Sequence, residues 1–194
     1  MNSDQMARGL DHYGALLHEA LAAVAVTCGG QAIDTEAAIE RVVAQLHDGK
    51  SKEGRVFFVG NGGSAAIASH CAADYMKNGR LRALSLHDPA VLTCIANDLG
   101  YERVFADQLR RHASRRDLLF IISSSGESPN ILQAAGAARD LSMTVITLSG
   151  FAAGNSLRTF GDIDFYVPST SYGIVEIAHL AICHAVLDRE MGIW

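Results

Sequence analysis

The chain has 194 residues, a formal net charge of −5, and 49% hydrophobic against 19% charged residues. This length suits one domain, and the apolar share excludes a disordered chain. No block of Lys or Arg stands out, which argues against a large nucleic-acid interface. No apolar run approaches the ~20 residues of a membrane-spanning helix, and the first residues lack the pattern of a signal peptide.

The cysteines are scattered along the chain without CxxC spacing; they are Cys28, Cys71, Cys94 and Cys183. In a chain of this size, such thiols are expected to be buried and reduced. We therefore expect a cytoplasmic protein that has neither nucleic acid nor a membrane as its partner.

The first fifty residues predict two helices. In the first helix, apolar residues recur at three- and four-residue steps: Leu10, Tyr13, Leu17, Leu21 and Val24. The stretch "CGGQAIDTE" then interrupts the pattern, and Asp34 or Thr35 can cap a second helix that carries Ile39, Val42, Val43 and Leu46.

Beyond this region, short apolar runs alternate with helical patterns. The predicted strands are "RVFFV" (55–59), "RALSL" (82–86), "DLLFIIS" (117–123), "TVITLS" (144–149) and "DFYVP" (164–168). The predicted helices cover 64–77, 89–112, 128–141 and 173–190. This order predicts the α/β class, as a three-layer α/β/α sandwich around a five-stranded parallel sheet. We expect residues 51–194 to form this domain and residues 1–50 to form helices that pack on it and on an oligomer interface.

Two of the predicted strands end in loops suited to an anion. "GNGGSAAIASH" (60–70) follows the first strand, and "ISSSGESPN" (122–130) includes the end of the third. Ligands of parallel α/β sheets bind at the carboxyl ends of the strands, and N–H groups at helix starts bind phosphate. The candidate phosphate-binding residues are Asn61, Gly62, Gly63, Ser64, Ser123, Ser124, Ser125 and Ser128. The alternative is an ordinary Ser/Gly loop in which Ser128 only caps the next helix.

Potential metal ligands lie on two predicted helices. His70 and Asp74 are four residues apart and share one helix face, whereas Glu176 and His184 are eight residues apart on the last helix. Two imidazoles and two carboxylates suit a divalent transition metal, with zinc favoured. The alternative is that His70 bonds a backbone carbonyl and Asp74 pairs with Lys77. His179 falls on another helix face and is expected to be structural or to lie at a subunit contact.

Four motifs together resemble the sugar isomerase (SIS) family: "GNGGSA", "CIANDLGYERVFADQL", "SSSGESPNIL" and "VEIAHLAICH". The resemblance runs from about residue 35 to the C-terminus, and within the family it is nearest to the isomerases of sedoheptulose 7-phosphate. It implies a homotetramer, often with zinc in each active site. It also implies the conversion of D-sedoheptulose 7-phosphate to D-glycero-D-manno-heptose 7-phosphate, an early step toward nucleotide-activated heptose for surface polysaccharide.

Carried over by position, the resemblance places the metal-binding and acid–base residues on His70, Asp74, Glu176 and His184. Asp74 would move the proton between the sugar carbons, and His184 would serve the oxygens. Two residues depart from the family pattern, because Asp74 stands where Glu is usual and Glu176 stands where Gln is usual. The shorter Asp74 withdraws its carboxylate by one methylene, whereas the added charge of Glu176 could strengthen a metal site or contact the substrate.

The resemblance also makes Asn97 and Asp98 candidates to contact the sugar hydroxyls, although a turn and a helix cap explain these two residues equally well. A rival reading is a SIS protein without catalysis that binds phosphosugars or partner proteins, as the replication-initiator-binding members do. Two histidines and two carboxylates that face one cleft favour the enzyme, because a scaffold has no physical need for them. A third reading is an isomerase that acts on another phosphosugar.

Overall fold

The computed structural model describes residues 9–194; the first eight residues, which fall in the stretch examined for a signal peptide, lie outside this range. The helices are α1 (Leu10–Ala22), α2 (Thr35–Ser51), α3 (Gly63–Lys77), α4 (Pro89–Leu99), α5 (Ala106–His112), α6 (Pro129–Asp140) and α7 (Tyr172–Glu190), with 3₁₀ turns η2 (Tyr101–Arg103) and η3 (Ser156–Thr159). The strands are β1 (Ala25–Cys28), β2 (Gln31–Ile33), β3 (Val56–Gly60), β4 (Ala83–Ser85), β5 (Leu118–Ser123), β6 (Thr144–Ser149) and β7 (Ile163–Tyr166). Within residues 9–194, no helix has the length and apolar character needed to cross a membrane.

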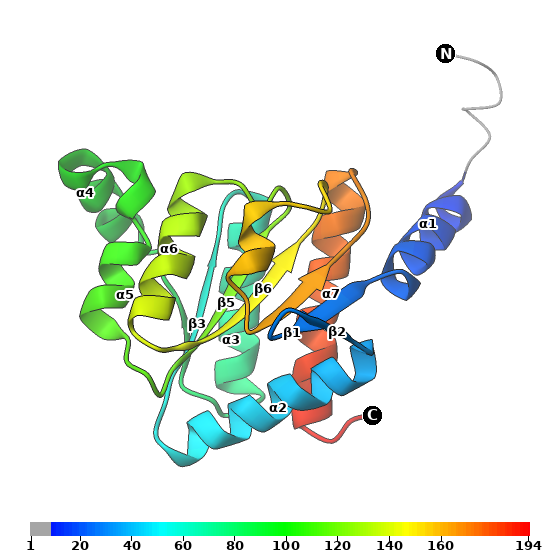
Figure 1. The fold of residues 1–194 in the computed structure, drawn as a ribbon, viewed down its shortest axis with the longest axis horizontal. Coiled ribbons are helices and arrows are strands. Elements are labelled where there is room, and N and C mark those ends of the chain that lie inside the picture. The colour runs from blue at the N-terminus through cyan, green and yellow to red at the C-terminus, as the bar shows by residue number, and fades with distance from the viewer. Residues whose placement is uncertain (1–8) are drawn as a thin grey trace.

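One sheet organises the molecule, in the order β2-β1-β7-β6-β5-β3-β4 (Figure 1). The five strands predicted from the sequence, β3 to β7, are all present and pair in parallel, which confirms the α/β class. The central strands β3 and β5 are buried along their whole length, as expected for a parallel sheet that helices cover on both faces.

The sheet has seven strands rather than the predicted five, because β1 and β2 add an antiparallel hairpin at its edge. The prediction took "CGGQAIDTE" for an interruption between two helices. Gly29 and Gly30 form the two-residue turn with φ of 56° and 78°, the left-handed backbone that such a hairpin needs. The first helix accordingly ends at Ala22, and Val24 lies beyond it.

Two hydrophobic layers enclose the sheet. One contains apolar side chains of α2, α3 and α7, and the other is formed mainly with α5 and α6. The predicted apolar face of α2 is buried, and Asp34 caps the helix by accepting a hydrogen bond from the N–H of Ala37 at 3.1 Å. In contrast, α1 extends away from the body of the molecule (Figure 1), and Leu10 and Leu16 on it are exposed.

Two further predictions need correction. The helix predicted over 89–112 is divided at Gly100, where φ is +94°, into α4, η2 and α5. The four cysteines are free thiols as predicted, but only Cys71 and Cys183 are buried, whereas Cys94 is exposed.

Candidate active site

A cavity of about 240 Å³ opens at the carboxyl edge of the sheet, between the ends of β3 and β5. Its lining contains all eight candidate phosphate-binding residues, together with Glu176 and a residue not predicted for the site, Tyr172. The two loops are therefore parts of one cavity. Their position follows from the parallel sheet, because the carboxyl ends of neighbouring strands meet at one edge.

The serine hydroxyls of this cavity have different surroundings. Ser123 Oγ accepts a hydrogen bond from the N–H of Gly126 at 3.1 Å, and Ser125 Oγ accepts one from the N–H of Glu127 at 3.3 Å. Ser128 occupies the N-cap position of α6, but its side chain makes no capping hydrogen bond. Its hydroxyl is thus available to a ligand, contrary to the alternative in which it only caps the helix.

An amide pair joins the two loops. Asn61 Nδ2 donates to Asn130 Oδ1 at 2.9 Å, and Asn130 Nδ2 donates to Asn61 Oδ1 at 2.8 Å. Tyr101 from η2 adds a hydrogen bond from its hydroxyl to Asn61 Oδ1 at 3.3 Å. Asn130 is only 2% exposed, so this pair fixes the start of α6 against the loop that precedes α3.

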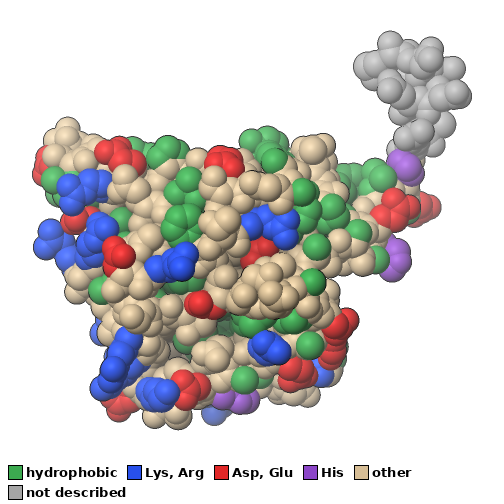
Figure 2. Space-filling model, in the orientation of Figure 1, with side chains coloured by type: hydrophobic (Ala, Val, Ile, Leu, Met, Phe, Trp, Pro, Cys, Tyr) green, Lys and Arg blue, Asp and Glu red, His purple; other side chains and the backbone are tan. Residues whose placement is uncertain are grey.

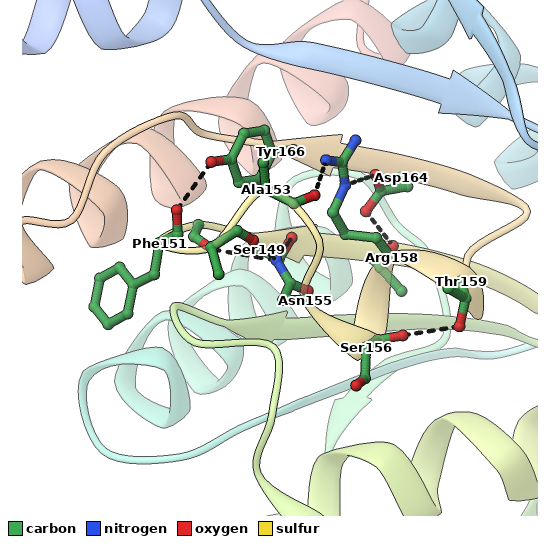
Figure 3. A network of polar contacts seen from close by, with 12 residues as sticks. Ser149, Phe151, Ala153, Asn155, Ser156, Arg158, Thr159, Asp164 and Tyr166 are labelled. Atoms are coloured by element: carbon green, nitrogen blue, oxygen red, sulfur yellow. Dashed lines mark hydrogen bonds and ion pairs between the residues drawn. The ribbon is translucent and has the colours of Figure 1, made fainter.

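A second network of polar contacts joins residues between 149 and 166 (Figure 3). Asn155 Nδ2 donates to Ser149 Oγ and to two backbone carbonyls of the loop after β6. Glu127 then accepts hydrogen bonds from the N–H and the hydroxyl of Ser156 at 2.7 and 2.8 Å. In the same network, Arg158 Nε donates to the fully buried Asp164 at 2.9 Å. The two bonds to Glu127 thus connect the serine loop to this network.

Glu176, expected as a metal ligand, instead lines the serine cavity and does not belong to the group formed by the two histidines and Asp74. A Cβ atom placed on Gly63 would be 2.4 Å from Glu176 Oε1, so only glycine at this position leaves room for the carboxylate. Gly63 is the first residue of α3, where the helix dipole favours a negative charge. The carboxylate of Glu176 therefore occupies the N-terminus of α3, within the cavity.

His70, Asp74 and His184 come together further along the same two helices. Nε2 of His70 lies 3.3 Å from Asp74 Oδ2 and 3.3 Å from Nε2 of His184, and Nδ1 of His184 lies 3.9 Å from Asp74 Oδ2. One ligand atom from each of the three residues lies within 4.8 Å of the others. The alternative partners, a backbone carbonyl for His70 and Lys77 for Asp74, are not those that the structure shows.

This triad has the dimensions of a metal site. Ligand atoms held about 2.0–2.1 Å from a tetrahedral zinc ion lie about 3.3–3.4 Å from one another. The two separations from His70 Nε2, both 3.3 Å, match that value, whereas the third, between His184 Nδ1 and Asp74 Oδ2, is longer at 3.9 Å. Two imidazoles with one carboxylate are a common donor set. Three protein ligands also leave one tetrahedral position for a substrate oxygen or water. The triad can therefore hold a divalent metal ion.

Asn97, Asp98 and His179 do not line the cavity. Asn97 and Asp98 lie exposed in the last turn of α4, with Asn97 Nδ2 donating to Asp98 Oδ1 at 2.8 Å. His179 is fully buried, and its Nε2–H donates to the carbonyl of Ser149 at 3.1 Å. Burial lowers the pKa of His179 to about 4, so this residue is neutral at physiological pH.

Sequence reasoning missed Tyr172, Asn130 and His87. His87 Nε2–H donates to the carbonyl of Gly60 at 2.9 Å, and burial lowers the pKa of its imidazole. It thus supports the end of β3, directly before the GNGGS loop. Of these three residues, only Asn130 lies within one of the four family motifs, "SSSGESPNIL", and so had a signal in the sequence.

The comparisons with known proteins agree with this geometry. Residues 21–150 match the family model described as SIS domain. A phosphoheptose isomerase of Citrifermentans bemidjiense is 34% identical over 78% of this chain and 81% of the relative, and one of Mycobacterium tuberculosis is 40% identical over 70% and 71%. This chain belongs to the phosphoheptose isomerase family of SIS-domain proteins.

Solved structures of this family share the fold. The phosphoheptose isomerase of Francisella tularensis superposes with a TM-score of 0.82 at 28% identity, covering 99% of this chain and 100% of the other. That of Neisseria gonorrhoeae gives a TM-score of 0.79 at 28% identity, covering 94% and 97%. The likeness extends over nearly the whole chain.

Proposed function

We propose that this chain is an aldose–ketose isomerase that converts D-sedoheptulose 7-phosphate to D-glycero-D-manno-heptose 7-phosphate through an enediolate. The product would serve nucleotide-activated heptose and surface polysaccharide synthesis. The observation that carries the proposal is that a serine-lined cavity and a metal-binding triad lie on the same pair of parallel helices, α3 and α7.

The spacing of the two parts suits a long phosphosugar. His70 follows Gly63 by seven residues, or about 10.5 Å of helix, and His184 follows Glu176 by eight residues, or about 12 Å. Both helices begin at the carboxyl edge of the sheet and run away from it in the same direction. An open-chain sugar phosphate bound along this pair would have its phosphate at the serines and its carbonyl end toward the triad.

At the phosphate end, Ser64, Ser123, Ser125 and Ser128 would bind the phosphate oxygens, together with backbone N–H groups at the start of α6. Asn61 and the buried Ser124 complete this pocket. Binding energy at this remote end would fix the reacting carbons, which is how non-reacting groups contribute to catalysis. Glu176 would accept a hydrogen bond from a sugar hydroxyl. Asn97 and Asp98 do not line the cavity, so they would contact only a part of the sugar that extends outside it.

At the reacting end, His70, Asp74 and His184 would hold zinc, one ion per subunit. When bound, the ion supplies Lewis acidity that polarises the C1 and C2 oxygens. Asp74 Oδ2 faces the two imidazoles, which leaves Oδ1 for the proton that moves between C1 and C2. Oδ1 accepts only a long hydrogen bond of 3.4 Å from Asn78 Nδ2. His184 would give and take the oxygen proton.

We propose that the enzyme acts in the cytoplasm as a homotetramer. The exposed apolar residues of α1 support assembly, because Leu10, Tyr13 and Leu16 have no core of their own to enter. Closed tetramers with two-fold axes are the common way to bury such faces. The free thiols of the four cysteines agree with a reducing compartment.

The decisive experiment measures deuterium incorporation from heavy water into sedoheptulose 7-phosphate by NMR. Asp74→Asn and His184→Ala should each abolish exchange at the substrate carbon, because each removes a proton carrier. Inorganic phosphate should still compete for the serine cavity in both variants, since the cavity is about 10 Å away along the helices.

Glu176→Gln is the matched control, because it changes a carboxylate of the same site without touching the triad. It should retain substantial exchange and an unchanged zinc content. Full exchange in Asp74→Asn would overturn the role of Asp74 as the proton carrier. If metal-loaded wild-type protein exchanged no proton with any phosphosugar, the non-catalytic reading would replace this proposal.

A further inference from the structure

A groove crosses the amino-terminal edge of the parallel sheet, at the end opposite the candidate active site. It consists of three open depressions of about 710, 230 and 530 Å³. Gln45 and Thr144 line both the first and the second, and Arg115 and Arg116 line both the second and the third. Because neighbouring strands lie about 4.8 Å apart, the groove spans about 19 Å beneath β7, β6, β5, β3 and β4.

Basic side chains concentrate along this groove. We call it the basic groove and define it by Arg41, Lys52, Arg55, Arg82, Arg115, Arg116 and Arg139. These seven are drawn from the sixteen Lys and Arg residues of the chain, yet only four of its twenty-one acidic residues line the same depressions. In Figure 2, a group of blue side chains lies at the lower left of the molecule, where Figure 1 shows the C-terminal end of α2. A chain with net charge −5 thus concentrates positive charge on one edge.

The arginines of the basic groove are not neutralised by carboxylates. Among residues 9–194, none of its six arginines forms an ion pair, whereas four arginines elsewhere do: Arg103, Arg111, Arg158 and Arg189. Arg55 donates to the carbonyl of His112 at 3.0 Å, and Arg139 donates to that of Thr159 at 3.3 Å. Such single bonds orient each guanidinium and leave most of its five N–H donors for a ligand.

Two of the acidic residues in the groove are bonded to the backbone instead. Asp117, only 5% exposed, accepts hydrogen bonds from the N–H of Arg55 and from the N–H of Ser114, both at 2.7 Å. Asp162 accepts one from the N–H of Val145 at 2.8 Å. These carboxylates stabilise the strand starts and do not occupy the guanidinium groups. Within the part of the chain that the structure describes, Lys52 is the one cation of the basic groove that pairs with a carboxylate, Asp48 at 2.7 Å. The six arginines of the groove therefore remain able to bind an external anion.

We propose that the basic groove binds an extended acidic segment of a partner protein. An extended chain advances about 3.3 Å per residue, so about six residues span the groove. Guanidinium groups in a row match carboxylates along such a chain, which is a known mode of acidic-motif recognition. Met143 and Ile163, both almost fully buried, provide an apolar floor in the first depression, where one apolar side chain of the segment would lie.

Other anions fit the groove less well. Its lining residues include no Phe, Tyr or Trp, so nucleic-acid bases would find no stacking surface. The depressions are open to solvent along one side and would not enclose most of a small nucleotide, as ligand pockets do.

The test uses a fluorescein-labelled peptide of about seven residues, Glu and Asp around a central Leu, with binding followed by anisotropy. Wild-type protein should bind it, and raising the salt from about 0.05 M to about 0.3 M should weaken binding strongly, because screening acts on exposed charges. Arg41→Gln and Arg115→Gln should each weaken binding about three- to tenfold, since they contact different parts of the peptide.

Arg103→Gln is the charge-matched control, because Arg103 pairs with Asp107 outside the groove. It should change affinity by no more than about twofold, since a distant surface charge is largely screened. Thermal unfolding of every variant confirms that it is folded. The proposal is overturned if the two groove variants bind like Arg103→Gln, if the peptide does not bind, or if tripolyphosphate or single-stranded DNA binds more tightly than the peptide.

Discussion

The amide pair of Asn61 and Asn130 offers a sharp test of how the phosphate cavity is held. Asn130→Ala removes two neutral hydrogen bonds of 2.8 and 2.9 Å, each with a net value of about 1 kcal/mol. Asn130 is nearly fully buried, so truncation also leaves a small void. We expect a loss of about 2 kcal/mol, or about 4–8 °C in the unfolding temperature of a chain of this length.

The kinetic effect should appear in binding at the phosphate end. Releasing the start of α6 from the GNGGS loop separates the two halves of the cavity, so KM and the inhibition constant of inorganic phosphate should rise together by about tenfold, or 1.4 kcal/mol. The value of kcat should change by less than about threefold, because the triad is about 10 Å away. A double-mutant cycle with Asn61→Ala should give a coupling energy of about 1–2 kcal/mol.

Ser128→Ala is the matched comparison within the same loop. Its hydroxyl makes no capping hydrogen bond, so the substitution should raise KM and the phosphate inhibition constant without lowering the unfolding temperature. A positioning role for Asn130 therefore predicts losses of both stability and phosphate affinity, and a contact role for Ser128 predicts a loss of affinity alone. If Asn130→Ala lowered stability while the phosphate inhibition constant stayed the same, the pair would be structural only.

Two further predictions concern stability and assembly. Burial lowers the pKa of His179 to about 4, whereas the same imidazole in the unfolded chain has a pKa of about 6.5. As the pH falls below about 6.5, the unfolded chain therefore binds a proton that the folded chain does not. The folded state loses stability over this range, down to about pH 4. Urea unfolding should show wild type losing about 2 kcal/mol relative to His179→Gln between pH 7 and pH 5, and parallel curves would contradict this. Light scattering at micromolar concentration should give a tetramer, and Leu10→Glu with Leu16→Glu should dissociate it; a monomeric wild type would refute the assembly.

Much of the fold could be predicted because its signals are local. Each buried strand is a short apolar run, and α2 has both an apolar period and a local cap at Asp34. The hairpin was not predicted because β1 and β2 are only four and three residues long. Strands this short show no clear alternation of apolar and polar residues, and the helical patterns on either side of them are stronger. Its one local signal is the Gly29–Gly30 pair, which by itself indicates a loop as readily as a hairpin turn.

The candidate site, like the fold, could be predicted only where its signals are local in the sequence. The spacing of His70 and Asp74 predicts a shared helix face, and the structure has it. The amide pair of Asn61 and Asn130 joins residues 69 positions apart, and no local sequence pattern predicts such a contact. The basic groove could not be predicted for the same reason, because its cations come from positions between 41 and 139. The sequence therefore shows no basic block, although these side chains lie along one edge of the folded chain.

Glu176 and Asp74, the two residues that depart from the family pattern, lie at opposite ends of the candidate site. Their substitutions therefore have different consequences. Because α3 and α7 start at the same edge and run side by side, Glu176 lies level with Gly63, whereas His184 lies level with His70. The Glu176 charge therefore lies in the serine-lined cavity, where the proposed function puts the substrate phosphate, at a helix N-terminus that stabilises a carboxylate. The shorter Asp74 acts at the other end, where it still reaches His70 at 3.3 Å. The geometry thus retains the triad and alters the cavity, so the departures bear on which phosphosugar is accepted more than on whether protons can be moved.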